Sequence, residues 1–251
     1  MKDSQLLALA INAAILGGEE IIKIYNDEFE VSFKEDNSPL TVADENANAI
    51  IESLLEVTNI PILSEEGRDV PYQERKKWDR LWIVDPLDGT KEFVKRNGEF
   101  TVNIALIENG KPILGVIYVP VTSVLYYASN EGAFKKVNNI VVQLPNVNQK
   151  NNFVAVGSRS HQSDETKAYF EELSKKHGNV EIVSMGSSLK ICLVAEGSAD
   201  VYPRFAPTME WDTAAGHAIA NFAGKKLIDY TTKKEMRYNR EQLLNNWFIV
   251  S

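Results

Sequence analysis

The sequence predicts a layered α/β fold with an α+β N-terminal half, because three patterns follow one another along its 251 residues. Two amphipathic helices are expected near residues 4–25 and 42–57. Closely spaced strands are expected between residues 81 and 136. Beyond residue 152, candidate strands and helices alternate, which is typical of an α/β layer.

The first helix is predicted from apolar residues that recur at helical spacing: Leu6, Leu7, Ala10, Ala14, Ile21 and Ile22. Short strands are expected at residues 31–34 and 61–64, with a turn at Asn37-Ser38-Pro39 before the second helix. Residues 68–77 are polar, which favours a surface loop or a short helix. Five strands follow, at residues 81–84, 100–108, 113–119, 123–128 and 133–136, with a tight hairpin at Asn109-Gly110.

Residues 137–152 are rich in Asn and Gln and are the best candidate boundary between two lobes. We therefore expect an α+β lobe at residues 1–140, carrying most of the functional acids, and an α/β lobe at residues 141–251. In the second lobe, strands are expected at residues 153–156, 181–183 and 200–202, and helices at residues 164–177, 189–195 and 212–222.

Composition excludes several classes of protein. The net charge of −8 argues against a nucleic-acid polymer as partner, because such binders are usually basic. The single cysteine, Cys192, permits no intramolecular disulfide, and we interpret it as a small core residue. The chain shows neither a signal peptide nor an apolar run long enough to span a membrane, which favours a cytoplasmic location.

The most informative stretch follows the apolar residues 81–84, where a predicted buried strand ends at Asp85-Pro86-Leu87-Asp88-Gly89-Thr90. A buried strand is expected to end on turn residues, but it has no structural need for two acids three positions apart. Such acids would repel each other and carry a desolvation cost unless a positive charge lay between them. Mg²⁺ suits that place, because it prefers oxygen ligands and binds through a few carboxylates.

Three further acids stand where predicted strands end or helices begin: Asp44, Glu65 and Asp212. Together they could complete a site for two or three Mg²⁺ ions, with the Leu87 carbonyl and the Thr90 hydroxyl as additional oxygens. Such a site neutralises phosphate oxygens and activates a water molecule. Thr90 could accept the proton of this water and pass it to Asp44 or Glu65. Taken singly, Asp44 and Asp212 would be plain helix caps, and Glu65 would lie in a solvated turn.

Three cationic or titratable residues of the second half each allow two interpretations. Lys190 follows small residues at a helix start, which suits either a phosphate site or a surface lysine. Arg204 could form a bidentate contact with a phosphate or a structural ion pair. His161 could contact a base or simply be exposed in a polar loop.

Taken together, Glu65-Glu66, the segment from Asp85 to Thr90 and Trp211-Asp212-Thr213-Ala214-Ala215-Gly216 resemble the inositol monophosphatase superfamily of Mg²⁺-dependent phosphatases. The resemblance implies an α-β-α-β-α sandwich of the inositol monophosphatase and fructose-1,6-bisphosphatase type. It also implies that Glu65, Asp85, Leu87 (through its carbonyl), Asp88 and Asp212 bind the metal ions, and that Asp44, Glu65 and Thr90 serve catalysis.

Other stretches resemble the bacterial 3′(2′),5′-bisphosphate nucleotidases of that superfamily: residues 34–41, 89–93, 96–105, 157–161 and 186–190. This resemblance implies hydrolysis of adenosine 3′,5′-bisphosphate, and of 3′-phosphoadenosine 5′-phosphosulfate, at the 3′-phosphate. It further implies a substrate pocket formed by Glu65, Leu87, Asp88, Gly89, Thr90, His161, Ser187, Lys190, Arg204 and Asp212.

Alternative functions remain open at this point. Inositol monophosphate and fructose 1,6-bisphosphate are the other substrates within the superfamily. A haloacid dehalogenase-type phosphatase would place two acids at spacing i, i+2 after a strand, whereas here the spacing is i, i+3 and Pro86 is expected to break the strand. A non-catalytic Mg²⁺- or nucleotide-binding regulator is the alternative from another class. The sequence leaves open whether the protein is a monomer or a homodimer. The resemblance also allows peripheral attachment to the inner membrane, which no feature of the sequence indicates.

Overall fold

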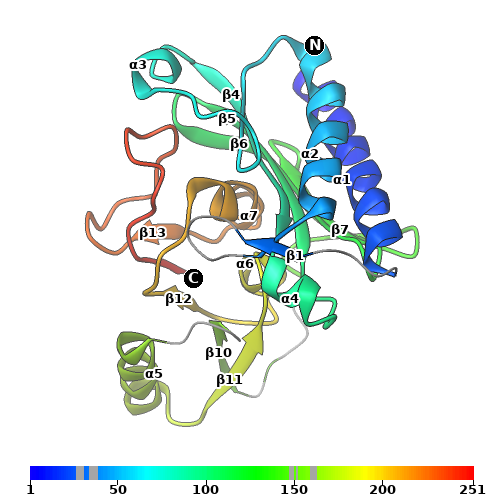
Figure 1. The fold of residues 1–251 in the computed structure, drawn as a ribbon. Coiled ribbons are helices and arrows are strands. Elements are labelled where there is room, and N and C mark those ends of the chain that lie inside the picture. Colours follow the sequence, from blue (N-terminus) through cyan, green and yellow to red (C-terminus); the bar gives the residue numbers. More distant parts are fainter. Residues whose placement is uncertain (27–30, 34–38, 147–149, 151, 159–162) are drawn as a thin grey trace.

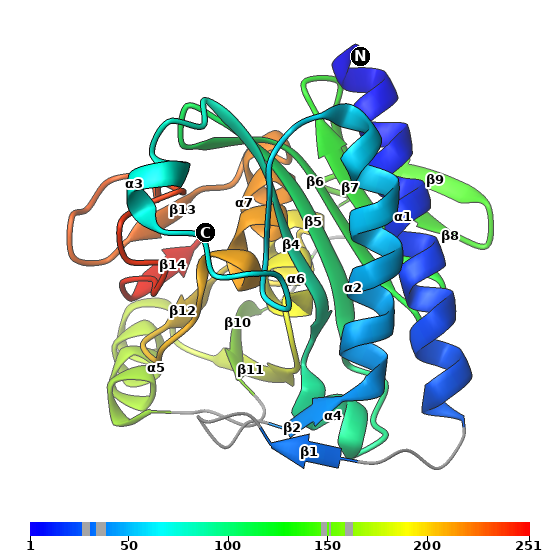
Figure 2. The same cartoon turned by 45° about the horizontal axis from the view of Figure 1, so that its top comes forward.

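The computed structural model describes residues 1–26, 31–33, 39–146, 150, 152–158 and 163–251. Helices and sheets alternate in five layers, α-β-α-β-α, as the resemblance implies (Figures 1 and 2). Within the described ranges, no helix is both long and apolar enough to cross a membrane.

A seven-stranded sheet in the order β3-β4-β5-β6-β7-β8-β9 forms the centre of the molecule. Only the β3–β4 pair within it is parallel, and each later strand runs antiparallel to its neighbour. The strands are β3 (Ile62–Ser64), β4 (Arg80–Asp88), β5 (Thr101–Glu108), β6 (Lys111–Val119), β7 (Val124–Ser129), β8 (Gly132–Val137) and β9 (Ile140–Gln143).

Helices cover both faces of this sheet. On one face lie α1 (Asp3–Tyr25) and α2 (Val42–Leu55), and on the other lie α6 (Leu189–Glu196) and α7 (Glu210–Phe222), as Figure 2 shows. Along β4, Trp82 and Val84 pack into the core formed with α1 and α2, whereas Leu81 and Ile83 pack into the core formed with α6 and α7. Burial on both faces explains why β4 reads as a continuous apolar run instead of an alternating one.

Beyond α6 and α7, smaller sheets and one helix form the outer two layers. The parallel pair β10 (Phe153–Ser158) and β11 (Val180–Met185) lies beside the antiparallel sheet β12-β14-β13, and α5 (Asp164–His177) covers them (Figure 1). Further elements are β1 (Val31–Phe33), β2 (Pro39–Thr41), a 3₁₀ turn at Glu56–Thr58, α3 (Tyr72–Arg75), α4 (Thr90–Val94), β12 (Tyr202–Arg204), β13 (Leu227–Asp229) and β14 (Phe248–Val250).

Most predicted elements are confirmed, but some boundaries were wrong. The strand expected to break at Pro86 continues to Asp88, with a register shift between Asp85 and Asp88 where Pro86 cannot donate to the sheet. The strand expected at residues 200–202 lies at Tyr202–Arg204. Part of the turn expected at Asn37-Ser38-Pro39 lies outside the described residues.

Elements without a strong local pattern were missed, among them α4, β13 and β14. Strand β9 was missed as well, and it lies across the predicted boundary between residues 140 and 141, where it pairs with β8. The division into two lobes stays a prediction, although α6 and α7 share a core with β4 and β5.

Helix α7 approaches the central sheet closely because small residues face it. A Cβ placed on Gly115 of β6 would lie 2.7 Å from Ala218 Cβ and would also meet the Ala215 carbonyl. Residue 115 must therefore be glycine for the helix to pack at this distance. This packing sets the position of the first turn of α7, which carries Glu210 and Asp212.

Two buried charged residues hold the C-terminal segment against that first turn. The Glu210 carboxylate, fully buried, accepts hydrogen bonds from the main-chain N–H groups of Asn239 (2.6 Å) and Arg240 (3.0 Å), and from Arg240 Nε (3.0 Å). Arg75, also buried, donates from Nη2 to the Glu241 carbonyl at 2.8 Å and from Nη1 to the Arg240 carbonyl at 2.5 Å. Glu210 thus binds main-chain N–H groups of this segment, and Arg75 binds its main-chain carbonyl oxygens.

Replacing Glu210 with alanine should destabilise the fold by about 3–5 kcal/mol, because the partly buried Arg240 would lose its carboxylate partner and the N–H groups of Asn239 and Arg240 would lose their acceptor. The exposed pair Arg68–Glu74 provides a matched control, and Glu74→Ala should cost at most about 1 kcal/mol. Urea unfolding measures both. Equal losses in the two variants would contradict the role given to Glu210.

Candidate active site

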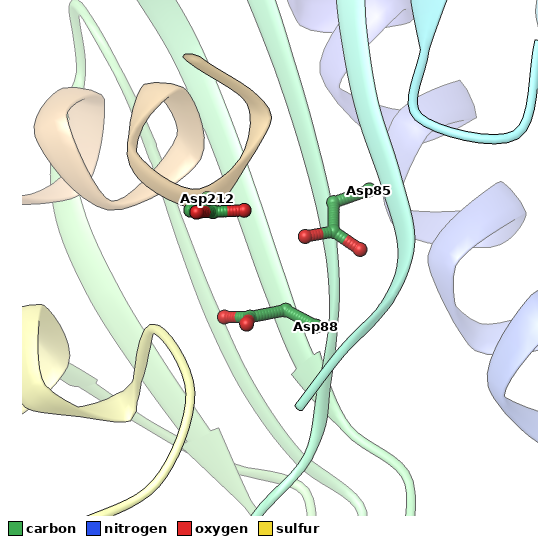
Figure 3. A group of neighbouring side chains, drawn as sticks. All are labelled: Asp85, Asp88 and Asp212. Atoms are coloured by element: carbon green, nitrogen blue, oxygen red, sulfur yellow. The ribbon is translucent and has the colours of Figure 1, made fainter. Parts of the chain in front are cut away.

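Three carboxylates from two elements point into one space at the end of β4. Asp85 and Asp88 come from β4, and Asp212 comes from the first turn of α7 (Figure 3). One oxygen from each lies within 4.8 Å of the others. The sequence-based prediction that these three acids meet is consistent with this geometry.

Main-chain donors hold each carboxylate in place. The Leu87 N–H donates to Asp85 Oδ1 at 3.1 Å, and the Met209 N–H donates to Asp212 Oδ2 at 2.8 Å. The Ser188 N–H donates to Asp88 Oδ2 at 2.6 Å. These contacts fix the carboxylates but do not neutralise their charges.

The electrostatics of the cluster are strained. Burial raises the pKa of Asp85 well above its ordinary value, and the carboxylates of Glu65, Asp88, Asp212 and Asp44 raise it further. Burial, followed by repulsion from Asp88 and Glu65, raises the pKa of Asp212 to about 8. Burial also raises the pKa of Asp88, although Lys190 and the Ser188 N–H oppose that shift.

A hard divalent cation fits this set of donors. Three or more carboxylates that repel one another at close range would be stabilised by a positive charge between them, and all the donors are oxygens, which Mg²⁺ prefers. Asp85, Asp88 and Asp212 are the residues that could hold such an ion. Glu65 lines the same cleft and acts electrostatically on two of them, so it could hold a second ion.

The three carboxylates line a cleft with a volume of about 440 Å³, which lies within the range usual for small-ligand sites. Nine of the ten residues predicted to bind substrate line it: Glu65, Leu87, Asp88, Gly89, Thr90, Ser187, Lys190, Arg204 and Asp212. The tenth, His161, lies outside the described residues.

Lys190 is not the surface lysine that one interpretation of the sequence allowed. Its side chain is buried, and its Nζ donates to the carbonyl oxygens of Ser187 and, at 3.4 Å, of Met185. Burial lowers the pKa of Lys190 to about 8, while the nearby Asp88 carboxylate acts in the opposite direction. A second cation, Arg204, is the last residue of β12, and its Nη2 donates to the Pro207 carbonyl at 2.9 Å. Its buried Nε has no hydrogen-bond partner among the described residues.

The residues predicted to activate water occupy different positions around the cluster. Thr90 is the first residue of α4, directly after Gly89, which adopts a φ of 96° that favours glycine. Asp44 is buried in the first turn of α2 and raises the pKa of Asp85. Their joint role in catalysis stays a prediction.

Sequence reasoning missed several polar residues at or beside the cleft. Glu92 and Ser188 are buried and line it, and Tyr202 lies under Lys190, whose Nζ is 5.6 Å from the ring centroid. Asn103 is buried on β5 and donates to Asp88 Oδ2 at 3.4 Å. A buried polar residue in the apolar run of β5 was the one signal that could have marked Asn103.

Comparison with known proteins identifies the family. The model of the inositol monophosphatase family matches residues 2–249. The chain belongs to the inositol monophosphatase family. This match decides against the haloacid dehalogenase-type alternative.

Several full-length relatives are named 3′(2′),5′-bisphosphate nucleotidase CysQ. The chain is 48% identical to the 3′(2′),5′-bisphosphate nucleotidase CysQ of Salmonella typhimurium, and equally to that of Escherichia coli, over 98% of both chains in each case. Among solved structures, CysQ of Bacteroides thetaiotaomicron is 53% identical with a TM-score of 0.91, and the alignment covers 98% of this chain and 97% of that one. The Thermotoga maritima IMPase is 25% identical with a TM-score of 0.78, covering 98% and 92%.

The raised pKa values predict a pH-dependent response to Mg²⁺. Because the pKa of Asp212 rises from 3.8 to about 8 on folding, the metal-free protein should lose stability as the pH rises between these values. Mg²⁺ needs the ionised carboxylates, so the gain in Tm that it produces should be larger at about pH 8 than at about pH 5.5. Thermal unfolding with Mg²⁺ or with a chelator measures this gain.

Asp212→Asn separates repulsion from cation binding in the same assay. It should raise the Tm of the metal-free protein at about pH 8 by roughly 2–4 °C and abolish most of the gain from Mg²⁺. Asp164→Asn, at an exposed position on α5, is the control and should change neither quantity. An undiminished gain in Asp212→Asn would refute the placement of a cation beside Asp212.

Proposed function

We propose that this protein is a Mg²⁺-dependent phosphomonoesterase that removes the 3′-phosphate of adenosine 3′,5′-bisphosphate, and of 3′-phosphoadenosine 5′-phosphosulfate, giving AMP and phosphate from the former. The full-length relatives called 3′(2′),5′-bisphosphate nucleotidase CysQ support the reaction. The observation that carries the proposal is one cleft lined by two groups of side chains: the carboxylates Asp85, Asp88 and Asp212, called here the acidic end, and the cations Lys190 and Arg204, called the cationic end.

The two ends suit the two halves of a nucleotide bisphosphate. Asp85, Asp88, Asp212 and Glu65, with the Leu87 carbonyl, would hold two or three Mg²⁺ ions next to the phosphate that is cleaved. Lys190 Nζ and Arg204 Nε would face the retained phosphate, because Lys190 is buried, Arg204 Nε lacks a hydrogen-bond partner among the described residues, and a phosphate would accept charge-assisted hydrogen bonds from both. Ser187, on the turn before α6, lines the same cleft.

Magnesium supplies charge neutralisation and a more acidic water, as in other phosphoryl transfers. The protein's residues orient the substrate and move the proton. The main-chain N–H groups of Gly89 and Thr90 would hold the phosphate that is cleaved, and the Thr90 hydroxyl, assisted by Asp44 or Glu65, would accept the proton of the attacking water.

Inositol monophosphate and fructose 1,6-bisphosphate are the alternative substrates. Inositol monophosphate carries a single phosphate, whereas two cationic side chains in the same cleft as the carboxylates favour a substrate with two phosphates. Fructose 1,6-bisphosphate also has two phosphates, so the substrate panel must separate it from adenosine 3′,5′-bisphosphate. A non-catalytic binding role would not require Thr90 and Asp44, the two residues predicted to activate water.

Phosphate release from a panel of substrates with Mg²⁺ tests the proposal. Adenosine 3′,5′-bisphosphate should have the highest kcat/KM, and Asp88→Asn should lower its kcat by at least about 100-fold, because one ligand charge is lost while the volume of the side chain is kept. Full activity of Asp88→Asn at saturating Mg²⁺, or a preference for inositol monophosphate, would refute the assignment.

Lys190→Ala and Arg204→Ala test the cationic end. Each should raise KM for adenosine 3′,5′-bisphosphate by about tenfold, the effect of losing one charge-assisted contact, and should change KM for inositol monophosphate much less. Lys95→Ala, at an exposed position just after α4, is the control and should leave both KM values unchanged. Equal effects of Lys190→Ala on the two substrates would count against recognition of a second phosphate.

A further inference from the structure

A chain of buried hydrogen bonds ends on one oxygen of Asp88. Thr101 Oγ1 lies 2.8 Å from Ser188 Oγ, and the Ser188 hydroxyl donates to Asn103 Oδ1 at 2.8 Å. Asn103 Nδ2 in turn donates to Asp88 Oδ2 at 3.4 Å, and the Ser188 N–H donates to the same oxygen at 2.6 Å. Thr101, Asn103 and Ser188 are 0%, 1% and 4% exposed, so water does not compete for these contacts.

The donors and acceptors allow only one direction of donation along this series of hydrogen bonds, from Thr101 towards Asp88. Ser188 has a single hydroxyl proton, which it gives to Asn103 Oδ1, so Thr101 must donate to Ser188. With its oxygen held by Ser188, Asn103 presents its NH₂ group to Asp88, whereas a flipped amide would place two oxygens against each other. Both donors end on Oδ2 of Asp88, and among the described residues none donates to Oδ1. Oδ1 is therefore the oxygen left for a cation.

Other contacts fix the turn that precedes α6 and contains Ser188. Gly186 N–H donates to Glu99 Oε2 at 2.7 Å, and Lys190 Nζ donates to the Ser187 carbonyl. A Cβ on Gly186 would lie 2.8 Å from Glu92 Cγ, which leaves the turn no room to shift in that direction. Because Ser188 belongs to this turn and also bonds Asp88, a displacement of Asp88 would be transmitted to Lys190.

We propose that Asn103 and Ser188 are positioning residues that aim Asp88 Oδ1 at a cation and couple the acidic end of the cleft to its cationic end. The proposal rests on the proposed function for the nature of the two ends. Asn103 and Thr101 do not line the cleft, so any effect that they have on cation or substrate must pass through Asp88 and Ser188. Residues that orient metal ligands commonly affect metal affinity by about 10–100-fold.

Isothermal titration of Mg²⁺ into metal-free protein, without substrate, tests the proposal directly. Asn103→Leu should raise the Kd for Mg²⁺ by about 10–100-fold, and Ser188→Ala by about threefold to tenfold. Ser188→Ala keeps the main-chain N–H and nearly all of the volume, so it decides the matter if Asn103→Leu does not fold. Thr166→Val is the control, because Thr166 is a buried threonine on α5 and does not line the cleft, and its Kd should stay within about twofold of wild type.

Steady-state kinetics at saturating Mg²⁺ provide the second readout. If the two ends are coupled, KM for adenosine 3′,5′-bisphosphate should rise in Asn103→Leu and Ser188→Ala, although neither change touches Lys190. A lower Tm in both variants, with the Kd for Mg²⁺ unchanged within about twofold, would overturn the proposal and leave these residues a structural role only. Absence of nucleotide hydrolysis in the wild-type protein would refute the proposed function, whereas the change in the Kd for Mg²⁺ would still be observed.

Discussion

Repulsion among the carboxylates of Asp85, which is buried, and of Asp88 and Asp212, which are partly buried, is the constraint on which the site depends. The fold brings these groups within 4.8 Å of one another and holds each with a main-chain N–H, so they cannot move apart to relieve it. The energy needed to hold them comes from the surrounding core, where β4 is buried on both faces and α7 packs closely against β6. Such a preformed acidic site binds a cation at little cost in reorganisation.

The two ends of the cleft come from different parts of the chain and are joined by few residues. Asp85 and Asp88 lie on β4, while Lys190 and Arg204 belong to α6 and β12. Asp212 on α7 and Ser188 before α6 bring the second group of elements to the first. Helix α7 packs closely against the sheet, and Glu210 binds the C-terminal segment. Both contacts thus position the site residues as well as stabilise the fold.

The sequence predicted the elements whose apolar residues recur with a clear period. It also predicted the site residues that interrupt such an apolar pattern. Helix α5 was predicted at its observed bounds, and Asp85 and Asp88 were recognised because acids at the end of a buried strand need a partner. Strand β12 was misplaced and β14 was missed because both are three residues long and depend on pairing with each other. The burial of Lys190 and the chain from Thr101 to Asp88 could not be predicted, because both arise where α6 meets β4 and β5 across about 100 residues of sequence.

The most direct test of the account is anomalous diffraction from crystals grown with Mn²⁺, a heavier ion that accepts the same oxygen ligands as Mg²⁺. An anomalous peak is expected between the carboxylates of Asp85, Asp88 and Asp212, with Asp88 Oδ1 facing it. A cluster without such a peak, in which the side chain of Lys190 or Arg204 has moved to neutralise the three acids, would contradict it.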